Sequence, residues 1–307
     1  MQIDIVIVNW NAGNLLHECV DSVIRYGVPL VSKIIVVDNN SSDDSTFFIE
    51  SLPKVDLLRA HENLGFGKAC NLGATYCDSE FVLFLNPDAR IYPDTLKSVL
   101  GFMGEKENLN VGICGVQLEN ENGEIARSNS RFPSVTGLLS HSAGLSKLFP
   151  ILGAPMNEWD HSSTKAVDQV IGAFFFVRRC LFESLDGFDE RFFVYFEEVD
   201  FSFRAKLLGW SSVYFSGAKA FHVGGGSSQQ VKAKRLFYSQ RSRIQYVFKH
   251  FNALGLVLVL LGTLFIEPAV RITVAISNKS LLSIKENLSA YCMLYSWLFR
   301  YKFGGKK

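Results

Sequence analysis

Strand and helix patterns alternate along the first 120 residues of the chain. Five short apolar runs have the composition of buried strands, at residues 3–8, 34–37, 55–58, 81–85 and 111–116. Helical patterns lie between them, at residues 14–26, 43–51 and 67–76. Because this alternation is typical of parallel strands covered by helices, it predicts a doubly wound α/β domain with a mostly parallel sheet.

The pattern changes after residue 116. Residues 117–165 lose their periodicity and become rich in Gly, Ser, Asn and Pro. A stretch this long without clear elements is usually functional, so we expect a lid or an acceptor loop, with an irregular insertion as the alternative. Strand patterns return at residues 167–177, 213–215 and 219–222, and a helical pattern covers 197–208.

Charge divides the chain near residue 230. Residues 1–230 hold 18 Lys and Arg against 28 Asp and Glu, whereas residues 231–307 hold 13 against 2. A total of 307 residues is more than one hydrophobic core usually fills. We therefore expect an acidic α/β domain over residues 1–230 and a basic, apolar helical extension over residues 231–307.

The extension has features of a membrane-binding segment. Residues 231–250 carry six Lys and Arg and no acid, and they precede an uncharged run of 14 residues at 253–266. This run is shorter than the roughly 20 residues that span a bilayer as a helix, so a helix lying in the membrane surface is favoured over a tilted span. Its apolar content favours lipid over nucleic acid as the partner.

An apolar stripe follows in the extension. Ile284, Leu288, Tyr291, Tyr295 and Leu298 recur at helical spacing. The stripe would face lipid, the domain 1–230, or a second subunit, which leaves a homodimer open. The six cysteines show no zinc or disulfide spacing, and the N-terminus has no secretory pattern. We expect a cytoplasmic protein, peripheral at the inner face of the cell membrane.

Polar side chains follow three of the predicted strands. Asn9 and Asn11 follow the first, Asp38 the second, and Asn86 and Asp88 the fourth. Ligands of open parallel sheets bind at these carboxyl ends. The first strand lacks the G-x-G-x-x-G pattern of dinucleotide sites, so a mononucleotide or nucleotide sugar is the expected ligand.

Each of these residues also has a purely structural interpretation. Asp38 suits a ribose or base, although Asx-rich runs also cap helices. Asp88 suits a hard cation bridging phosphates, although Asn-Pro-Asp alone predicts a type I turn. His222, before three glycines, is a candidate metal or phosphate contact, and a lone histidine is as often structural.

A third acidic cluster lies at a predicted helix start. Glu197, Glu198 and Asp200 stand among Phe and Tyr residues, where partial burial raises a carboxylate's affinity for protons. This favours a general base. Acids in a first helical turn also interact favourably with the helix dipole, which would explain one or two of them without any function.

Six motifs follow one another along the chain: IVIVNWN at 5–11, VVDNNSSDDS at 36–45, ENLGFGKACNLG at 62–73, FLNPDA at 84–89, GFDERFFVYFEEVDFSFR at 187–204 and HVGGGS at 222–227. Taken in this order they resemble the family-2 glycosyltransferases, most closely the bacterial rhamnosyltransferases of cell-surface polysaccharide assembly. The resemblance covers about residues 3–230. It implies the glycosyltransferase-A fold, inverting transfer from a nucleotide-diphosphate sugar, and dependence on Mg or Mn.

The resemblance also implies roles for individual residues. Asp38 matches the base-binding aspartate, with Asn9 and Asn11 in the same pocket. Gly65, Lys68 and Asn71 match the loop and helix start near the nucleotide and diphosphate. Asp88 matches the last acid of the D-x-D motif, whose first acid is replaced here by Asn86, so that the metal has fewer charged ligands.

The catalytic pair of the family corresponds to Glu197 and Glu198. Glu198 is the implied base, with Glu197 and Asp200 as further candidates, and His222 gains support as a metal or diphosphate ligand. The resemblance implies dTDP-rhamnose as donor, with a UDP-hexose or UDP-galactofuranose as runner-up, and a glycan or lipid-linked glycan as acceptor. A nucleotidyltransferase and a non-catalytic membrane scaffold are the rival functions.

Overall fold

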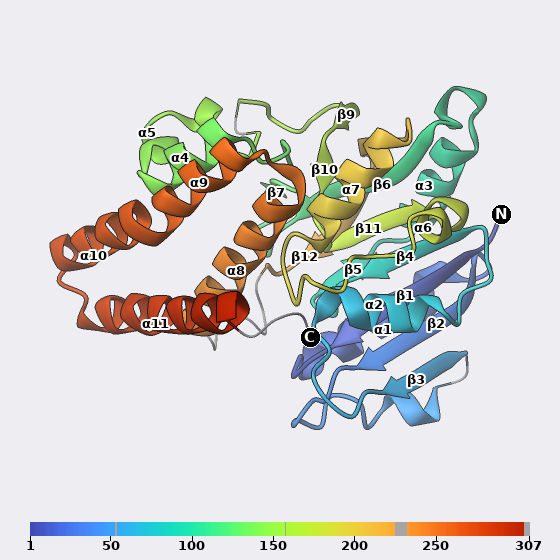
Figure 1. Cartoon of the computed structure of the whole chain (residues 1–307). Coiled ribbons are helices and arrows are strands. Elements are labelled where there is room, and N and C mark those ends of the chain that lie inside the picture. The colour runs from blue at the N-terminus through green and yellow to red at the C-terminus, as the bar shows by residue number, and fades with distance from the viewer. Residues whose placement is uncertain (53, 157, 225–231, 304–307) are drawn as a thin grey trace. The chain divides into compact units, whose positions relative to one another are not determined.

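The computed structural model describes residues 1–303 apart from residues 53, 157 and 225–231. The chain forms two compact units (Figure 1). The first unit combines Met1–Phe132, Trp159–Phe193 and the stretch from Glu197 through the last strand, β12 (Ser211–His222). The second combines Pro133–Glu158, Val194–Phe196 and the C-terminal helices, so it is assembled from three separate pieces of sequence.

A mixed β-sheet forms the centre of the first unit (Figure 1). Its other main strands are β1 (Ile3–Asn9), β2 (Val31–Asp38), β3 (Val55–Arg59), β4 (Phe81–Leu85), β5 (Ala89–Ile91), β6 (Val111–Glu119) and β11 (Phe174–Arg178). The strand order is β3-β2-β1-β4-β11-β6-β12-β5. The four N-terminal strands of this order are parallel, and so are β6 and β12, whereas β11 runs antiparallel to both its neighbours.

Short strands complete the sheet structure. β7 (Ile125–Ala126) pairs with β6, and β9 (Lys165–Val167) pairs with β12. β8 (Asn129–Ser130) and β10 (Gln169–Val170) form a separate two-stranded sheet. The expected α/β architecture is therefore confirmed, with β11 as the antiparallel exception in the middle of the sheet.

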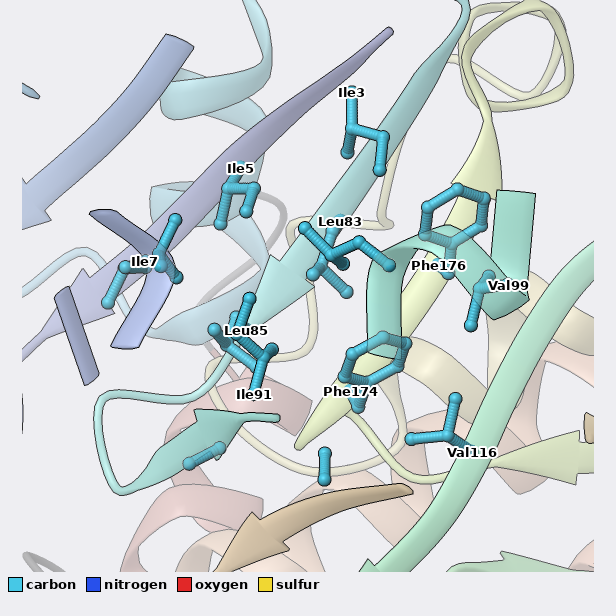
Figure 2. Packing of buried hydrophobic residues seen from close by; sticks show 14 of the residues in the cluster. Ile3, Ile5, Ile7, Leu83, Leu85, Ile91, Val99, Val116, Phe174 and Phe176 are labelled. Atoms are coloured by element: carbon cyan, nitrogen blue, oxygen red, sulfur yellow. The ribbon is translucent and has the colours of Figure 1, made fainter. Parts of the chain in front are cut away.

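Helices cover both faces of the sheet. One face packs on α1 (Asn14–Gly27) and α3 (Thr95–Gly104), and the other on α2 (Phe66–Ala74), α6 (Arg179–Ser184) and α7 (Glu197–Leu207). Alternate residues of β1 enter the two cores: Ile3, Ile5 and Ile7 face α1, and Val6 and Val8 face α2. Figure 2 shows the first of these cores, where the three isoleucines pack near Leu83 and Phe176. A strand buried on both faces accounts for the uninterrupted apolar runs in the sequence.

The helix predicted over residues 43–51 is wrong. Only a 3-10 turn, η1 (Ile49–Ser51), forms there, and a second such turn, η2 (Lys106–Asn108), follows α3. Asp43 accepts hydrogen bonds from the Gly13 N–H (2.9 Å) and the Ser45 hydroxyl (2.5 Å). Side chains that bond to nearby backbone in this way compete with helix formation.

The two strands predicted at 213–215 and 219–222 are one strand, β12. Its register against β6 shifts between Phe215 and Lys219, where extra residues bulge out of the ladder. The polar and glycine residues of the bulge, which interrupt the apolar pattern, caused the prediction of two strands.

The second unit is helical. It contains α4 (Val135–Ser142), α5 (Leu145–Leu148), the 3-10 turn η3 (Pro150–Leu152), α8 (Lys232–His250), α9 (Ala253–Leu261), the π-helical turn η5 (Gly262–Ile266), α10 (Glu267–Ser277) and α11 (Leu281–Phe303). Leu138 of α4 is buried with Val247 and Val259. The segment expected to be a long loop therefore contributes helices to this unit, because an apolar residue of α4 completes its core.

The helices α9, η5 and α10 form one continuous helix, Ala253–Ser277, of 25 residues. It is the one helix in the described part of the chain that is long and apolar enough to cross a membrane, and 28% of its most apolar stretch is buried. This helix extends past the 14-residue run used for the sequence prediction.

Pro268 lies inside the continuous helix without ending it. A proline has no N–H to bond the carbonyl four residues earlier, here that of Leu264. The π-helical turn directly before it loosens the normal hydrogen-bond spacing. The hydroxyl of Tyr295 on α11 donates to the Leu264 carbonyl, so this acceptor keeps a partner.

Candidate active site

The carboxyl ends of β1 and β2 meet at a network centred on Asn9. Asn9 pairs with Asp38 in the strand register and is completely buried. Its side-chain nitrogen lies 3.2 Å from Asp38 Oδ1, 3.0 Å from Ser41 Oγ and 2.9 Å from Ser45 Oγ. The hydrogen bond from Asn9 therefore fixes the position of the Asp38 carboxylate.

Asp38 is held mainly through one of its two carboxylate oxygens. Its Oδ1 accepts from Asn9 and from the Ser41 N–H (3.3 Å). Its Oδ2 lies 3.8 Å from Nη1 of Arg59, whose side chain is half exposed. The carboxylate belongs to a turn and caps no helix of the described structure.

The loops after β1 and β2 are hydrogen-bonded to each other. Asn11 adopts a left-handed backbone conformation (φ 51°), and its Oδ1 accepts from the Ser42 N–H at 2.7 Å. The Ser41 hydroxyl accepts from the Asn11 N–H at 3.1 Å. Asn11 therefore positions the polar loop that carries Asp38.

Asn39 links these loops to the start of α2. Its side-chain nitrogen donates to Asn63 Oδ1 (3.1 Å) and to the Gly65 carbonyl (3.2 Å), and its Oδ1 accepts from the Leu64 N–H (2.8 Å). Asn39 is 3% exposed. Sequence analysis missed this residue, although the Asn-Asn pair after the β2 aspartate was a signal for it.

The start of α2 packs against the segment that leads to α7. The Phe66 N–H donates to the Phe193 carbonyl at 2.6 Å. Gly65 has φ 84°, and a Cβ there would lie 2.2 Å from that carbonyl oxygen, so a side chain cannot be accommodated. A Cβ on Gly67 would lie 3.3 Å from the Cβ of Glu197. Close backbone approach therefore explains the glycines of this motif.

Asn71 and Lys68 of α2 have different roles in the structure. Asn71 brackets Phe188, donating to its carbonyl (2.8 Å) and accepting from its N–H (2.9 Å). Lys68 lies in the first turn of α2, is about half exposed, and is 4.0 Å from Glu190. Asn71 thus orders the acidic segment, while the Lys68 ammonium group remains accessible to solvent.

Glu197 and Glu198 open α7 and lack full hydrogen bonding. Glu197 is 4% exposed, and Oε2 of each carboxyl is buried without a hydrogen-bond partner among the described residues. Burial raises the pKa of Glu198 to about 7. Burial, together with the charge of Glu198, raises the pKa of Glu197 well above its usual range. A carboxylate that titrates near neutrality suits a general base.

Asp200 differs from its two neighbours. It is completely buried, and its Oδ2 accepts from Nε of Arg204 at 2.7 Å. The same guanidinium donates to the carbonyls of Leu185 (2.7 Å) and Gly187 (2.8 Å). The Asp200–Arg204 pair therefore ties α7 to the turn before the acidic segment.

The backbone is strained directly before Glu197. Tyr195 and Phe196 both have left-handed conformations, with φ 68° and 72°, and such a conformation is uncommon for a bulky residue. Within the second unit, the Ser242 hydroxyl of α8 donates to the Val194 carbonyl at 2.8 Å. The Phe196 ring packs against Tyr246, with 5.5 Å between ring centroids.

Asp88 and His222 lie next to each other across β5 and β12. His222 pairs with Ala89 in the strand register, and the Val223 N–H donates to the Asp88 carbonyl at 3.1 Å. His222 Nε2 is 3.3 Å from Asp88 Oδ1, and these side chains are 12% and 10% exposed. Asn86–Ala89 is also a turn, closed by a 3.0 Å hydrogen bond from the Ala89 N–H to the Asn86 carbonyl.

The donor set at Asp88 suits a cation shared with a substrate. In the described part of the chain, no group of three or more His, Cys, Asp and Glu side chains is arranged so that it could hold a metal ion by itself. Asp88 and His222 supply a carboxylate and an imidazole side by side, and Nε2 of His222 is buried without a hydrogen-bond partner among the described residues. Mg²⁺ typically takes one or two protein ligands and completes its shell with phosphates and water. The residues present therefore fit such an ion.

Comparison with known proteins relates the chain to glycosyltransferases. Residues 4–153 match the model of glycosyl transferase family 2. The N-acetylglucosaminyl-diphospho-decaprenol L-rhamnosyltransferase of Mycobacterium tuberculosis is 28% identical over 237 residues, covering 70% of this chain and 73% of the relative. The rhamnosyltransferase WbbL of Escherichia coli K12 is 25% identical over 223 residues, covering 70% and 81%.

A solved structure shares the fold. The mannosyltransferase of Pyrobaculum calidifontis, solved with GDP-mannose and Mn²⁺, superposes with a TM-score of 0.56 at 14% identity, covering 99% of this chain and 88% of that one. The expected glycosyltransferase-A fold is thereby confirmed. Residues 4–153 are a family-2 glycosyltransferase domain, and the chain is a glycosyltransferase enzyme.

Proposed function

We propose that this enzyme transfers L-rhamnose from dTDP-rhamnose, with inversion and with the help of a divalent cation, to a hydroxyl of a lipid-linked glycan. The observation that carries the proposal is the pair Glu197 and Glu198. Two buried carboxyls with unpaired oxygens open a helix that packs on the predicted nucleotide loop. A buried polar group without a partner is costly for stability and is often kept for function.

Glu198 is the proposed base. Its pKa of about 7 lets it exist as a carboxylate at neutral pH, while Glu197, with its higher affinity for protons, stays protonated beside it. Asp200 is engaged by Arg204 and supports the helix start. Glu198 takes the proton of the acceptor hydroxyl as that oxygen bonds to the anomeric carbon. The bond from this carbon to the diphosphate breaks on the opposite face, which inverts the configuration.

Asp38 is the proposed contact to the nucleoside. Asn9, Ser41 and Asn11 hold its loop, and Asp38 Oδ2 accepts a hydrogen bond from the base or sugar of the nucleotide. Lys68, in the first turn of α2 and half exposed, faces the charge of the diphosphate. Gly65 and Asn71 serve this site indirectly, by close packing and by bracketing Phe188.

Asp88 and His222 are the proposed metal ligands, with Asn86 in the same turn toward the donor. A bound Mg or Mn ion would neutralise the negative charge that develops on the departing diphosphate. The Asn86 carbonyl and the strand pairing of His222 with Ala89 fix the two ligands in place. Asn86 stands where the D-x-D motif has its first acid, so Asp88 is the motif's one remaining carboxylate. We therefore expect the ion to bind weakly unless the donor is present.

The donor and acceptor assignments follow the relatives. Both rhamnosyltransferases align over 70% of the chain, and the name of the mycobacterial one specifies an N-acetylglucosaminyl-diphospho-polyprenol acceptor. A UDP-hexose or UDP-galactofuranose is the alternative donor. We assign the chemistry to residues 1–230 and a peripheral position at the cytoplasmic membrane face to the basic segment 231–307, which holds 13 Lys and Arg against 2 acids.

Product analysis tests the proposal. The enzyme is incubated with Mn²⁺, a panel of sugar nucleotides and an N-acetylglucosaminyl-diphospho-polyprenol acceptor, and the released nucleotides are identified. We expect dTDP from dTDP-rhamnose, only when the acceptor is present. If UDP were released from a UDP-sugar and no dTDP from dTDP-rhamnose, the donor would be the UDP-sugar. Nucleoside monophosphate or pyrophosphate would support a nucleotidyltransferase, and no turnover with any pair would support a scaffold.

A further inference from the structure

The segment 145–152 of the second unit exposes a dense set of apolar side chains. Leu148 is 73% exposed, Phe149 57% and Ile151 70%, and Leu145 and Leu152 are also exposed. Only Lys147 carries a charge in these eight residues. Contiguous exposed apolar surface usually marks a contact with another molecule or with a membrane.

The base of this segment is anchored to the apolar helix Ala253–Ser277. The Ser134 side chain accepts from the Gly137 N–H and caps α4, whose Leu138 is buried beside Val259. A Cβ on Gly144 would lie 3.4 Å from a methyl group of Val270 in α10. The segment 145–152 therefore emerges next to the helix with the greatest apolar character.

The continuous helix Ala253–Ser277 exposes apolar side chains of its own. Leu254, Val257, Leu261 and Phe265 are between 49% and 68% exposed along the continuous helix. An apolar area of this kind has three possible occupants: lipid, a second copy of the chain, or another protein.

Charge selects among these occupants. Residues 231–307 hold two acids, and one of them, Glu267, is 2% exposed and ion-paired with Arg243 (2.5 Å) and Arg271 (2.7 Å). Glu286 is the other. A second copy would bring two strongly basic segments together, which is unfavourable, whereas an anionic lipid surface is electrostatically complementary to the basic residues.

We propose that residues 145–152 form a second lipid-inserting element, which enters the same anionic membrane surface as the helices of residues 253–303. The inference extends the membrane part of the proposed function and rests on it. Two anchoring elements from distant parts of the sequence give stronger attachment than one, because the second inserts without a further loss of translational freedom.

Vesicle flotation tests the segment. Three proteins are mixed with vesicles of phosphatidylglycerol and phosphatidylcholine at low salt. They are the unchanged full chain, the double variant Leu148→Ser/Ile151→Ser, and the matched control double variant Phe47→Ser/Leu109→Ser. Phe47 and Leu109 are 72% and 61% exposed in the first unit. We expect the first variant to lose about tenfold or more in vesicle partitioning and the control to match the parent. Equal flotation of all three proteins would overturn the inference.

Depth-dependent quenching provides a second measurement. Phe149→Trp, Phe265→Trp and Phe47→Trp are mixed with vesicles of brominated lipid. We expect extra quenching for the tryptophans at 149 and 265 but not at 47. Quenching at 265 alone would restrict insertion to the C-terminal helices and overturn the inference.

Two readouts separate this inference from its alternatives. Release of dTDP with a water-soluble acceptor analogue reports the transferase independently of flotation, so loss of one does not imply loss of the other. Sedimentation without lipid reports self-association. If Leu148→Ser/Ile151→Ser converted a dimer to a monomer while flotation stayed unchanged, the segment would be a subunit interface instead.

Discussion

Two carboxyls in adjacent positions of a buried helix start do not ionise independently. Once one carries a charge, the other needs more energy to lose its proton. Burial raises the pKa of both Glu197 and Glu198, and the charge of Glu198 further raises that of Glu197. The first charge therefore belongs to Glu198, which makes this residue the better proton acceptor of the pair.

We expect Glu198→Gln to abolish transfer while leaving donor binding nearly intact. Loss of a positioned base typically costs on the order of a hundred- to ten-thousand-fold in rate. Steady-state turnover and calorimetric donor binding measure the two effects. In the parent enzyme, kcat/KM should rise with pH through about 7 as Glu198 loses its proton. If Glu198→Gln kept half of the activity while Glu197→Gln or Asp200→Asn was inactive, the residue whose variant was inactive would be the base instead.

Asp88→Ala should show the opposite pattern. Because Asp88 lies 3.3 Å from His222 in the proposed metal site, its loss should weaken Mn²⁺-dependent donor binding as well as turnover. Donor titrations with and without Mn²⁺ give the result. Glu119→Ala, which removes the mostly buried partner of the half-exposed Lys219, serves as a control for the loss of a carboxylate. If metal-dependent binding were unchanged in Asp88→Ala, this residue would be only part of the turn.

Single residues also show how far sequence reasoning reaches. The predicted site positions cluster at the strand ends, because a parallel sheet brings its carboxyl ends to one edge. Asn9 and Asn71, however, use their amides on protein partners. A side-chain amide can form the same hydrogen bonds with a ligand as with the protein backbone. Which partner it has therefore depends on which loop folds beside it. That information lies in tertiary structure.

At the level of elements, the segment before α7 combines strain with support. Left-handed conformations cost about 1–2 kcal/mol per non-glycine residue, and Tyr195 and Phe196 occupy two in succession. Ser242 and Tyr246 of α8 contact this segment. We infer that α8 holds the strained backbone and thereby orients the glutamates that follow it, so that Ser242 is a positioning residue.

Ser242→Ala should lower kcat severalfold while leaving the KM for the donor nearly unchanged. A typical hydrogen bond contributes about 1 kcal/mol, enough to let the strained segment relax part of the time. The pH midpoint of kcat should also shift, because the burial of Glu198 changes with the backbone. Ser242→Thr should restore the rate, and Ser239→Ala on the same helix is the control. An unchanged kcat and pH profile in Ser242→Ala would contradict the positioning role.

Elements were predicted best where one periodicity dominates. The strands β1, β2 and β4 were found from their apolar runs at residues 5–8, 34–37 and 81–85, which are buried on both faces. The stretch 43–51 has helical spacing but folds as a turn, because Ser45 accepts a hydrogen bond from Asn9 of β1 and Asp43 accepts one from the Gly13 N–H. Long-range bonds of this type leave no periodic trace in the sequence.

At the level of the whole molecule, the buried glutamates link activity to stability. Their pKa values are higher in the folded state than in the unfolded chain, so the folded state binds more protons between the two values. The free energy of unfolding therefore decreases as pH rises from about 4.5 through 7. Each pKa unit corresponds to about 1.4 kcal/mol.

We expect Glu198→Gln to have a higher Tm than the parent at pH 8 and a similar Tm at pH 4.5. Glutamine stands in for the protonated acid, which is the form that the buried site favours. Thermal unfolding at the two pH values measures this. Exposed Glu183→Gln, paired with Arg179 on the surface, is the control. A lower Tm of Glu198→Gln at pH 8 would mean that the charged carboxylate is stabilised in the fold.

The second unit is built from Pro133–Glu158, Val194–Phe196 and the helices after β12. A ribosome releases these pieces in order, with the sheet strands of the first unit between them. The core formed by Leu138, Val247 and Val259 cannot close until the last of its helices has been synthesised. The strained segment before Glu197 therefore lacks its contacts with Ser242 and Tyr246 until α8 has been synthesised. For this enzyme, we infer from the order of synthesis that Glu197 and Glu198, the proposed catalytic pair, reach their final backbone geometry only after the C-terminal helices have left the ribosome.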